Sequence, residues 1–262
     1  MTTVTSADGT AINVNDHGGD GPPVLLVHGI TESSGAWDPV VERLTPTNRV
    51  ITMDLRGHGA SGTADRYDLE AMAGDVVAVA TELGVAGSVH LVGHSLGGAV
   101  VSAVGAAADV ASVVNVDQSL QLGAFKGMLA EVEAMLRDEN AFPAVIDGMF
   151  EQLAGPMISG DAMGRVNAIR RPDQQVVLGV WDLLFSMSSE EVNAVVEGAL
   201  AGYAGRNVPY LTVFGADPGP EYEAWLGGHI AGATTELWAD HGHYPHLVDP
   251  DRFVARLHAF WG

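Results

Sequence analysis

The chain alternates between short β-branched runs and longer helical patterns, and this alternation constrains its fold more than any other feature. The runs that predict strands are 11–16, 23–29, 49–55, 88–94, 112–117, 209–215 and 234–239. Helical patterns occupy about 34–45, 68–84, 96–108, 219–230 and 249–261. Several runs are almost continuously apolar, as in parallel strands covered on both faces. Strand–helix alternation therefore predicts an α/β fold with a mainly parallel sheet.

The alternation stops between residues 118 and 205, where the sequence is helical in texture and rich in methionine. We expect 118–205 to form a helical insertion that packs on a core made of 1–117 and 206–262. The apolar residues of the insertion could line a hydrophobic pocket, with Trp181 and Phe185 as the first candidates. Equally, these side chains could simply supply the core that packed helices need.

Composition excludes several classes of partner and site. The net charge of −21 opposes binding to phosphate backbones and anionic lipid surfaces, so we expect neither a nucleic acid nor a membrane partner. The sequence has no cysteine, which rules out disulfides, thiolate metal sites and a cysteine nucleophile. The polar amino-terminal residues lack the features of a signal peptide, and we expect a cytoplasmic protein.

Ser95 lies in the stretch "VHLVGHSLGGAV", where an apolar strand pattern gives way to a helix of small residues. A serine at such a sharp strand-to-helix turn can serve as a nucleophile, since the turn exposes its hydroxyl at a helix amino terminus. Gly93 and Gly97 would let the strand and the helix approach closely. The motif is short in a chain with 33 glycines, so an incidental serine in a turn is the alternative.

A second motif follows the strand pattern of "VLLVHGITES", residues 24–33. Gly29 permits a tight turn, which would let the amide of Ile30 point into the site. Together with the amide of Leu96, it would form an oxyanion hole. His28 more plausibly braces this loop than takes part in the chemistry.

The third motif, "ADHGHYPHLVDPDRF", contains His241, His243 and His246. His243 lies in the middle of the loop after the last strand pattern, which favours it as the general base. His246 is closer to the final helix and is a candidate for packing. No acidic or histidine partner at helical spacing supports a metal site, so none is expected.

Two aspartates compete to orient this histidine. Asp217 follows the strand pattern at 209–215, and a buried carboxylate there would hold the imidazole in one tautomer. Asp117 ends the strand pattern directly after the serine helix and is the rival. Placement favours Asp217, although it could also be an ordinary turn residue before Pro218.

The glycine-rich segment "MDLRGHGASG", residues 53–62, carries Asp54, Arg56 and His58. Three ionisable groups suggest chemistry, but a loop stabilised by local hydrogen bonds explains them better. No Gly-Lys-Ser/Thr follows, so a phosphate-binding loop is not indicated.

Taken in order, "VHG", "MDLRGHGASG", "GHSLGG", "FGADP" and "HGHYPHLVDPDRF" resemble the serine α/β-hydrolases of the esterase, lipase and C–C-hydrolase type. The resemblance covers essentially the whole chain. It implies a mostly parallel eight-stranded sheet flanked by helices, with 118–205 as a helical cap between the sixth and seventh strands. It also implies Ser95 as nucleophile, His243 as base and Asp217 as acid. The acid loop departs from many relatives, which keeps Asp117 open.

The resemblance implies hydrolysis of a small to medium apolar carboxylic ester through an acyl-enzyme, with no cofactor. Lactones, thioesters and diketones cleaved at a C–C bond are alternatives that would use the same three residues. Cofactor-free oxygenase or perhydrolase chemistry is a further option, as is a ligand-binding protein without turnover. A serine in the turn argues against the branches that use a carboxylate nucleophile.

Overall fold

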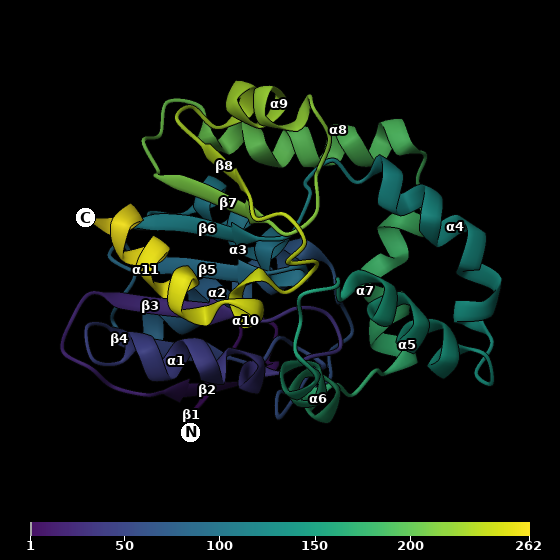
Figure 1. Cartoon of the computed structure of the whole chain (residues 1–262), viewed down its shortest axis with the longest axis horizontal. Helices are drawn as coiled ribbons and strands as arrows, with labels where there is room; N and C mark the ends of the chain where they lie inside the picture. Colours follow the sequence, from purple (N-terminus) through teal and green to yellow (C-terminus); the bar gives the residue numbers. More distant parts are fainter. Residues whose placement is uncertain (1) are drawn as a thin grey trace.

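The computed structural model describes residues 2–262, and within them the chain forms one eight-stranded sheet (Figure 1). The strands run in the order β1-β2-β4-β3-β5-β6-β7-β8. β2 pairs antiparallel with β1 and β4, and all other pairs are parallel. The strands are β1 (Thr2–Thr5), β2 (Ala11–Asp16), β3 (Pro23–Val27), β4 (Arg49–Met53), β5 (His90–His94), β6 (Ser112–Val116), β7 (Tyr210–Phe214) and β8 (Thr234–Leu237).

Helices cover both faces of this sheet, which explains why its central strands are mostly apolar and almost fully buried. One face packs against α2 (Leu69–Glu82), α3 (Leu96–Ala107) and α9 (Tyr222–His229). The other packs against α1 (Asp38–Leu44) and α11 (Pro250–Trp261), which lie in front of the sheet in Figure 1. The short η1 (Ser34–Trp37) and α10 (Pro245–Val248) precede α1 and α11.

Between β6 and β7, in the stretch 118–205 that sequence analysis singled out, the chain forms a run of helices. They are α4 (Gly123–Arg137), α5 (Phe142–Leu153), α6 (Gly160–Ile169), α7 (Gln174–Ser186) and α8 (Ser189–Leu200), followed by η2 (Ala201–Tyr203). α4, α5, α6 and α7 extend beyond the strand ends in Figure 1, whereas α8 packs back against α3. α4, α5, α7 and α8 share an apolar cluster that also contains Ile30.

The predicted mainly parallel α/β architecture is confirmed, and the seven expected strands are present with ends shifted by up to two residues. The strand that sequence analysis missed is β1, a polar edge strand in which only Val4 is buried. Edge strands of this kind lack the apolar pattern that identifies buried ones. None of the helices formed by residues 2–262 has the length and apolar character needed to cross a membrane.

Close backbone packing positions the turn between β5 and α3. A Cβ on Gly93 would lie 2.1 Å from the carbonyl oxygen of Gly97, and one on Gly97 would lie 2.2 Å from that of Val27. Neither separation is possible for a real side chain, so both positions require glycine. The predicted close approach of strand and helix is therefore confirmed, and it fixes the turn that carries Ser95.

Candidate active site

Ser95 is held at the turn between β5 and α3 in a strained backbone conformation. Its φ of 50° and ψ of −122° lie in a region that side chains other than glycine rarely adopt. Its amide donates a hydrogen bond to the carbonyl of Val116 at the end of β6, at 2.9 Å. The residue is largely buried, with 8% of its surface exposed. Strain at such a turn projects the hydroxyl from the carboxyl edge of the sheet.

His243 and Asp117 meet at this same edge. The Nδ1 atom of His243 lies 2.7 Å from Oδ2 of Asp117, and both side chains are about nine-tenths buried. The other carboxylate oxygen, Oδ1, accepts a hydrogen bond of 2.7 Å from the amide of Gly215. Because Asp117 directly follows Val116, its carboxylate lies beside the strand end that binds Ser95. A carboxylate oxygen accepts, so Nδ1 is the donor in this contact, and in the neutral imidazole Nε2 is then the nitrogen without a proton.

Asp217, the acid favoured by the sequence, is not the partner of His243. Asp217 is exposed, and its Oδ1 accepts a hydrogen bond from the amide of Gly219 at 2.8 Å, as in an ordinary turn. Asp117 is better placed because β6 lies between β5 and β7 in the sheet, next to the serine-bearing strand. Its positive φ of 54° turns the chain at the end of β6. The chain order Ser–Asp–His fits either aspartate, so order alone could not separate them.

The two amides expected to bind an oxyanion find no acceptor within the part of the chain that the structure describes. Among residues 2–262, neither Ile30 N–H nor Leu96 N–H donates to a protein group. Leu96 is the first residue of α3, where free amides and the helix dipole favour negative charge. Ile30 follows Gly29 in a buried loop that turns at Thr31, whose φ is 67°. The arrangement is compatible with binding of a developing oxyanion.

His28 braces the loop after β3, as the sequence predicts. Its Nδ1 lies 2.7 Å from the carbonyl of Gly29, and its Nε2 lies 3.0 Å from the amide of Leu55. The first contact requires a proton on Nδ1 and the second an unprotonated Nε2, so the ring is neutral. Burial lowers the pKa of His28, which agrees with this tautomer.

The other two histidines of the third motif have packing roles. His246 is fully buried, and its ring lies 4.6 Å from that of Trp37. Burial lowers the pKa of His246 well below its usual range, so it remains neutral. The Nδ1 atom of His241 contacts the carbonyl of Ala239 at 3.0 Å.

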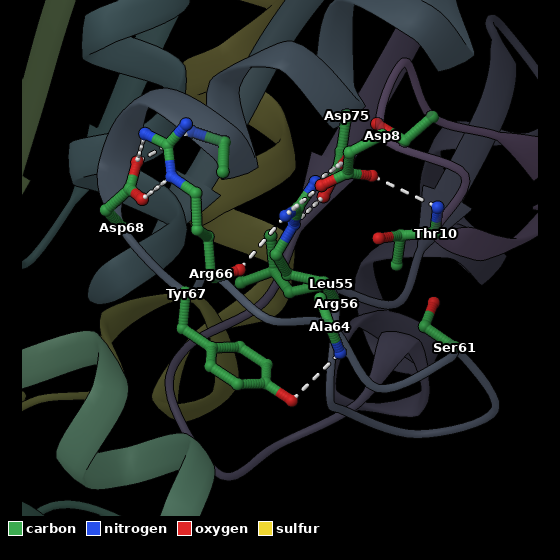
Figure 2. A network of polar contacts seen from close by, with 12 residues as sticks. Asp8, Thr10, Leu55, Arg56, Ser61, Ala64, Arg66, Tyr67, Asp68 and Asp75 are labelled. Carbon is green, nitrogen blue, oxygen red and sulfur yellow. Dashed lines mark hydrogen bonds and ion pairs between the residues drawn. The ribbon is translucent and has the colours of Figure 1, made fainter.

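The loop 53–62 is held by polar contacts within the loop and with neighbouring segments, in agreement with its predicted structural role. Arg56 is buried and forms two hydrogen bonds of 2.7 Å with the carboxylate of Asp75 in α2 (Figure 2). The same guanidinium reaches Asp8 at 2.8 Å. Asp54 accepts from the amides of Ser34 and Ala60, at 2.6 and 2.9 Å.

The helices between β6 and β7 contact both loops of the site. The amide of His243 donates to the carbonyl of Leu153 at the end of α5, at 2.8 Å. The amide of Arg171, after α6, donates to the carbonyl of Thr31 at 2.9 Å. The buried Arg170 side chain also reaches the hydroxyl of Thr31, at 3.3 Å. These helices are therefore bound to the elements that carry the candidate base and the Ile30 amide.

The two apolar residues suggested for substrate contact lie in the cluster that these helices share with the site loops. Trp181 is buried and contacts Phe125 edge-on, with ring centroids 5.7 Å apart. The cluster also includes Ile30 and, at its margin, Leu96. Phe185 is only partly buried, and the guanidinium of Arg137 lies 5.0 Å above its ring. Trp181 thus shares a cluster with both candidate oxyanion residues.

A second buried histidine–carboxylate pair was not anticipated from the sequence. The Nδ1 atom of His94 lies 3.3 Å from Oε2 of Glu32, and each side chain is about 1% exposed. Burial acts to raise the pKa of Glu32, but the charge of His94 and its hydrogen bond outweigh burial and lower that pKa to about 2. Burial likewise opposes a charge on His94, yet Glu32 raises its pKa overall.

The chain resembles known hydrolases over nearly its whole length. The model of a family described as "Alpha/beta hydrolase family" matches residues 24–256. A pimeloyl-[acyl-carrier protein] methyl ester esterase from Aliivibrio salmonicida is 27% identical over 92% of this chain and 93% of that protein. The crystal structure of esterase RhEst1 from Rhodococcus sp. ECU1013 superimposes with a TM-score of 0.72 at 26% identity, covering 99% and 98% of the two chains.

A more local similarity links the chain to a non-heme chloroperoxidase from Streptomyces lividans. The two are 43% identical over 101 residues, which is 37% of this chain and 36% of the chloroperoxidase. The alignment therefore spans only about a third of that relative.

Proposed function

The chain belongs to the α/β-hydrolase family, and within that family we propose that it is a serine hydrolase acting on carboxylic esters. The observation that carries the proposal is the 2.7 Å contact between His243 Nδ1 and Asp117 Oδ2, at the strand end that binds the backbone of Ser95. This contact leaves Nε2 of His243 as the available base. The esterase names of the two relatives aligned over most of their length support an ester as substrate.

In the proposed reaction, Nε2 of His243 removes the proton of the Ser95 hydroxyl as its oxygen attacks the ester carbonyl. Asp117 stabilises the imidazolium that forms and keeps the ring oriented. The amides of Ile30 and Leu96 bind the oxyanion of the tetrahedral intermediate. His243 then protonates the leaving alcohol, and water, activated by the same histidine, releases the acid from Ser95.

For the acyl group we propose an apolar chain of small to medium size. The helices α4 to α7 would act as a cap that covers the nucleophile and excludes water. The apolar cluster of α4, α5, α7 and α8 reaches Ile30 and Leu96, so an acyl chain attached at Ser95 would extend toward Trp181. No cofactor takes part in this scheme. A cytoplasmic location remains an expectation from the sequence.

The test is hydrolysis of p-nitrophenyl esters of graded acyl length by the native chain and by Ser95→Ala. We expect release of p-nitrophenol to be abolished by Ser95→Ala and unchanged by Ser88→Ala, which alters an exposed serine just before β5. A fluorophosphonate probe should label Ser95 in the native chain. Labelling of a different residue, or turnover that persists in Ser95→Ala, would contradict the proposal.

A panel of other substrates distinguishes the alternatives that use the same residues. Lactones, thioesters and a diketone are compared with the best ester by kcat/KM. If the highest kcat/KM belongs to one of these, the substrate class is corrected while the nucleophile stands. Tight ligand binding with no turnover of any of them would indicate a binding protein instead.

A further inference from the structure

The buried pair of His94 and Glu32 lies next to the candidate triad but is not part of it. His94 is the last residue of β5 and immediately precedes Ser95. Its ring lies 4.6 Å from the ring of His243, centroid to centroid. Glu32 lies in the loop after β3, three residues beyond Gly29. Burial of two charged groups costs desolvation energy, which suggests that the pair has a role beyond packing.

The contacts of His94 define its protonation state. Its Nε2 lies 2.7 Å from the backbone carbonyl oxygen of His243, and a carbonyl only accepts, so Nε2 carries a proton. Its Nδ1 faces Oε2 of Glu32 at 3.3 Å, and this oxygen also accepts from the amide of Gly29 at 3.1 Å. Nδ1 therefore carries a proton as well, and the ring is an imidazolium.

The alternative, a neutral imidazole beside a protonated carboxyl, fits the contacts poorly. The other oxygen of Glu32, Oε1, is buried and has no hydrogen-bond partner among residues 2–262. A proton there would have no acceptor. A proton on the other oxygen, Oε2, would have to reach Nδ1 across 3.3 Å, which is longer than a hydrogen bond from an O–H donor normally spans. The raised pKa of His94 and the lowered pKa of Glu32 agree with an ionised pair.

Three ionisable side chains near the His94 ring are uncharged. His246 lies 4.6 Å from it, centroid to centroid, and is neutral because burial lowers its pKa. Tyr244 lies 5.2 Å away, and burial raises the pKa of its phenol, so it is also uncharged. His28 is neutral through its two hydrogen bonds. The charge on His94 is thus balanced by Glu32.

This ion pair connects the three elements of the proposed active site. Through Nε2 it binds the backbone of His243, the proposed base. Through Glu32 it binds the amide of Gly29, directly before Ile30. A Cβ on Gly29 would lie 3.0 Å from Nδ1 of His94 and 3.2 Å from Cβ of Ser95, so these groups pack closely.

We propose that His94, as an imidazolium paired with Glu32, is a positioning residue that fixes the backbone of His243 and the loop of Ile30 relative to Ser95. His94 does not touch the reacting atoms and acts through the groups it binds. The role rests on the proposed hydrolase function, because it concerns the alignment of that machinery. A loss of alignment should lower the rate of the chemical step more than the affinity for substrate.

The protonation state can be measured without any activity. Nitrogen-15 NMR of histidine-labelled native chain at pH 8 should show one histidine with both ring nitrogens protonated. That signal should disappear in His94→Gln and in Glu32→Gln. If every histidine of the native chain has a single ring proton at pH 8, the inference is wrong, whatever the chain hydrolyses.

The positioning role is tested by kinetics on the best p-nitrophenyl ester. His94→Asn removes the donor to His243, and we expect kcat to fall about tenfold to a hundredfold with KM changed less than about twofold. His94→Gln places its amide nitrogen near the position of Nε2 but carries no charge for Glu32, so we expect its kcat to lie between that of His94→Asn and that of the native chain. The matched control is His90→Gln, at the other end of β5, which should retain native kcat.

Glu32→Gln keeps the side-chain volume and serves as the second variant if His94→Asn does not fold. It should lower kcat with little change in KM. Native kcat in Glu32→Gln or in folded His94→Asn would overturn the positioning role. Failure of the native chain to hydrolyse any ester would instead overturn the proposed function, and the NMR result would still decide the ion pair.

Discussion

Replacing Asp117 with asparagine is the substitution that tests the candidate triad most directly. Oδ1 of Asp117 accepts from the amide of Gly215 at 2.7 Å, so an asparagine would place its carbonyl oxygen there. Its NH₂ group would then point at Nδ1 of His243, where the carboxylate now lies at 2.7 Å. The amide donates, so Nδ1 would have to accept and the ring proton would move to Nε2. The histidine could no longer take the proton of Ser95.

A wrong tautomer of this kind lowers kcat by about ten thousandfold in a comparable triad, which corresponds to about 5.5 kcal/mol of transition-state stabilisation. We expect a loss of that order in Asp117→Asn for hydrolysis of p-nitrophenyl butyrate, with KM little changed. Circular-dichroism melting would establish that the variant is folded. Asp217→Asn is the matched control and should retain native kcat, because its carboxylate only caps a turn. A kcat for Asp117→Asn within about tenfold of native, or a comparable loss in Asp217→Asn, would refute the reasoning.

Three further predictions concern stability and packing. Gly215→Ala would place a Cβ 1.8 Å from the carbonyl oxygen of Gly242, and we expect it to lower both the melting temperature and kcat. The control is Gly227→Ala, whose Cβ would meet nothing within 4 Å and which should lower neither. Arg56→Met leaves a buried carboxylate unpaired and should cost about 3–5 kcal/mol in urea unfolding; a loss below about 1 kcal/mol would contradict this. The pKa of Glu32 is lowered from about 4.5 to about 2 in the folded chain. The ionised carboxylate therefore stabilises the folded state fully above pH 5, and this contribution is lost as the pH falls from about 4.5 to about 2. Between pH 5 and pH 2, the free energy of unfolding of Glu32→Gln should therefore fall by about 3 kcal/mol less than that of the native chain, as measured by acid titration.

Sequence patterns predicted the central sheet well because its strands are buried on both faces. The run 112–117, for example, becomes β6, whose residues are all buried. The same reasoning missed β1, where three of four residues are exposed and threonine predominates. An edge strand is stabilised by backbone pairing with β2 and by contacts distant in sequence. Local hydrophobic pattern does not contain that information.

The site was predictable where a residue's place follows from a local turn. Ser95 and the amides of Ile30 and Leu96 lie directly after strand patterns, so their positions at the sheet edge could be expected. The choice between Asp117 and Asp217 depended on which loop turns toward His243, and that is a tertiary property. The strand order, which places β6 beside β5, supplies the missing information.

The glutamate–histidine pair could not be derived in the same way. Glu32 and His94 are 62 positions apart, and each has an unremarkable place in its own motif. Their contact follows from the parallel pairing of β3 with β5, which brings the ends of the two strands together. A sequence alone identifies the motifs but does not show that their polar side chains form a buried bond.

The contacts of the amino-terminal hairpin bear on how the chain is assembled during synthesis. Ser6, in the turn between β1 and β2, hydrogen-bonds to Asp75 in α2, 69 positions later. Asp8 reaches Arg56 in the same network. These two early residues emerge from the ribosome well before their partners, so the first strands must wait before they can be bound in place. Folding of this edge is therefore coupled to translation of the first third of the chain, and a ribosome stalled near residue 70 should carry an unprotected hairpin.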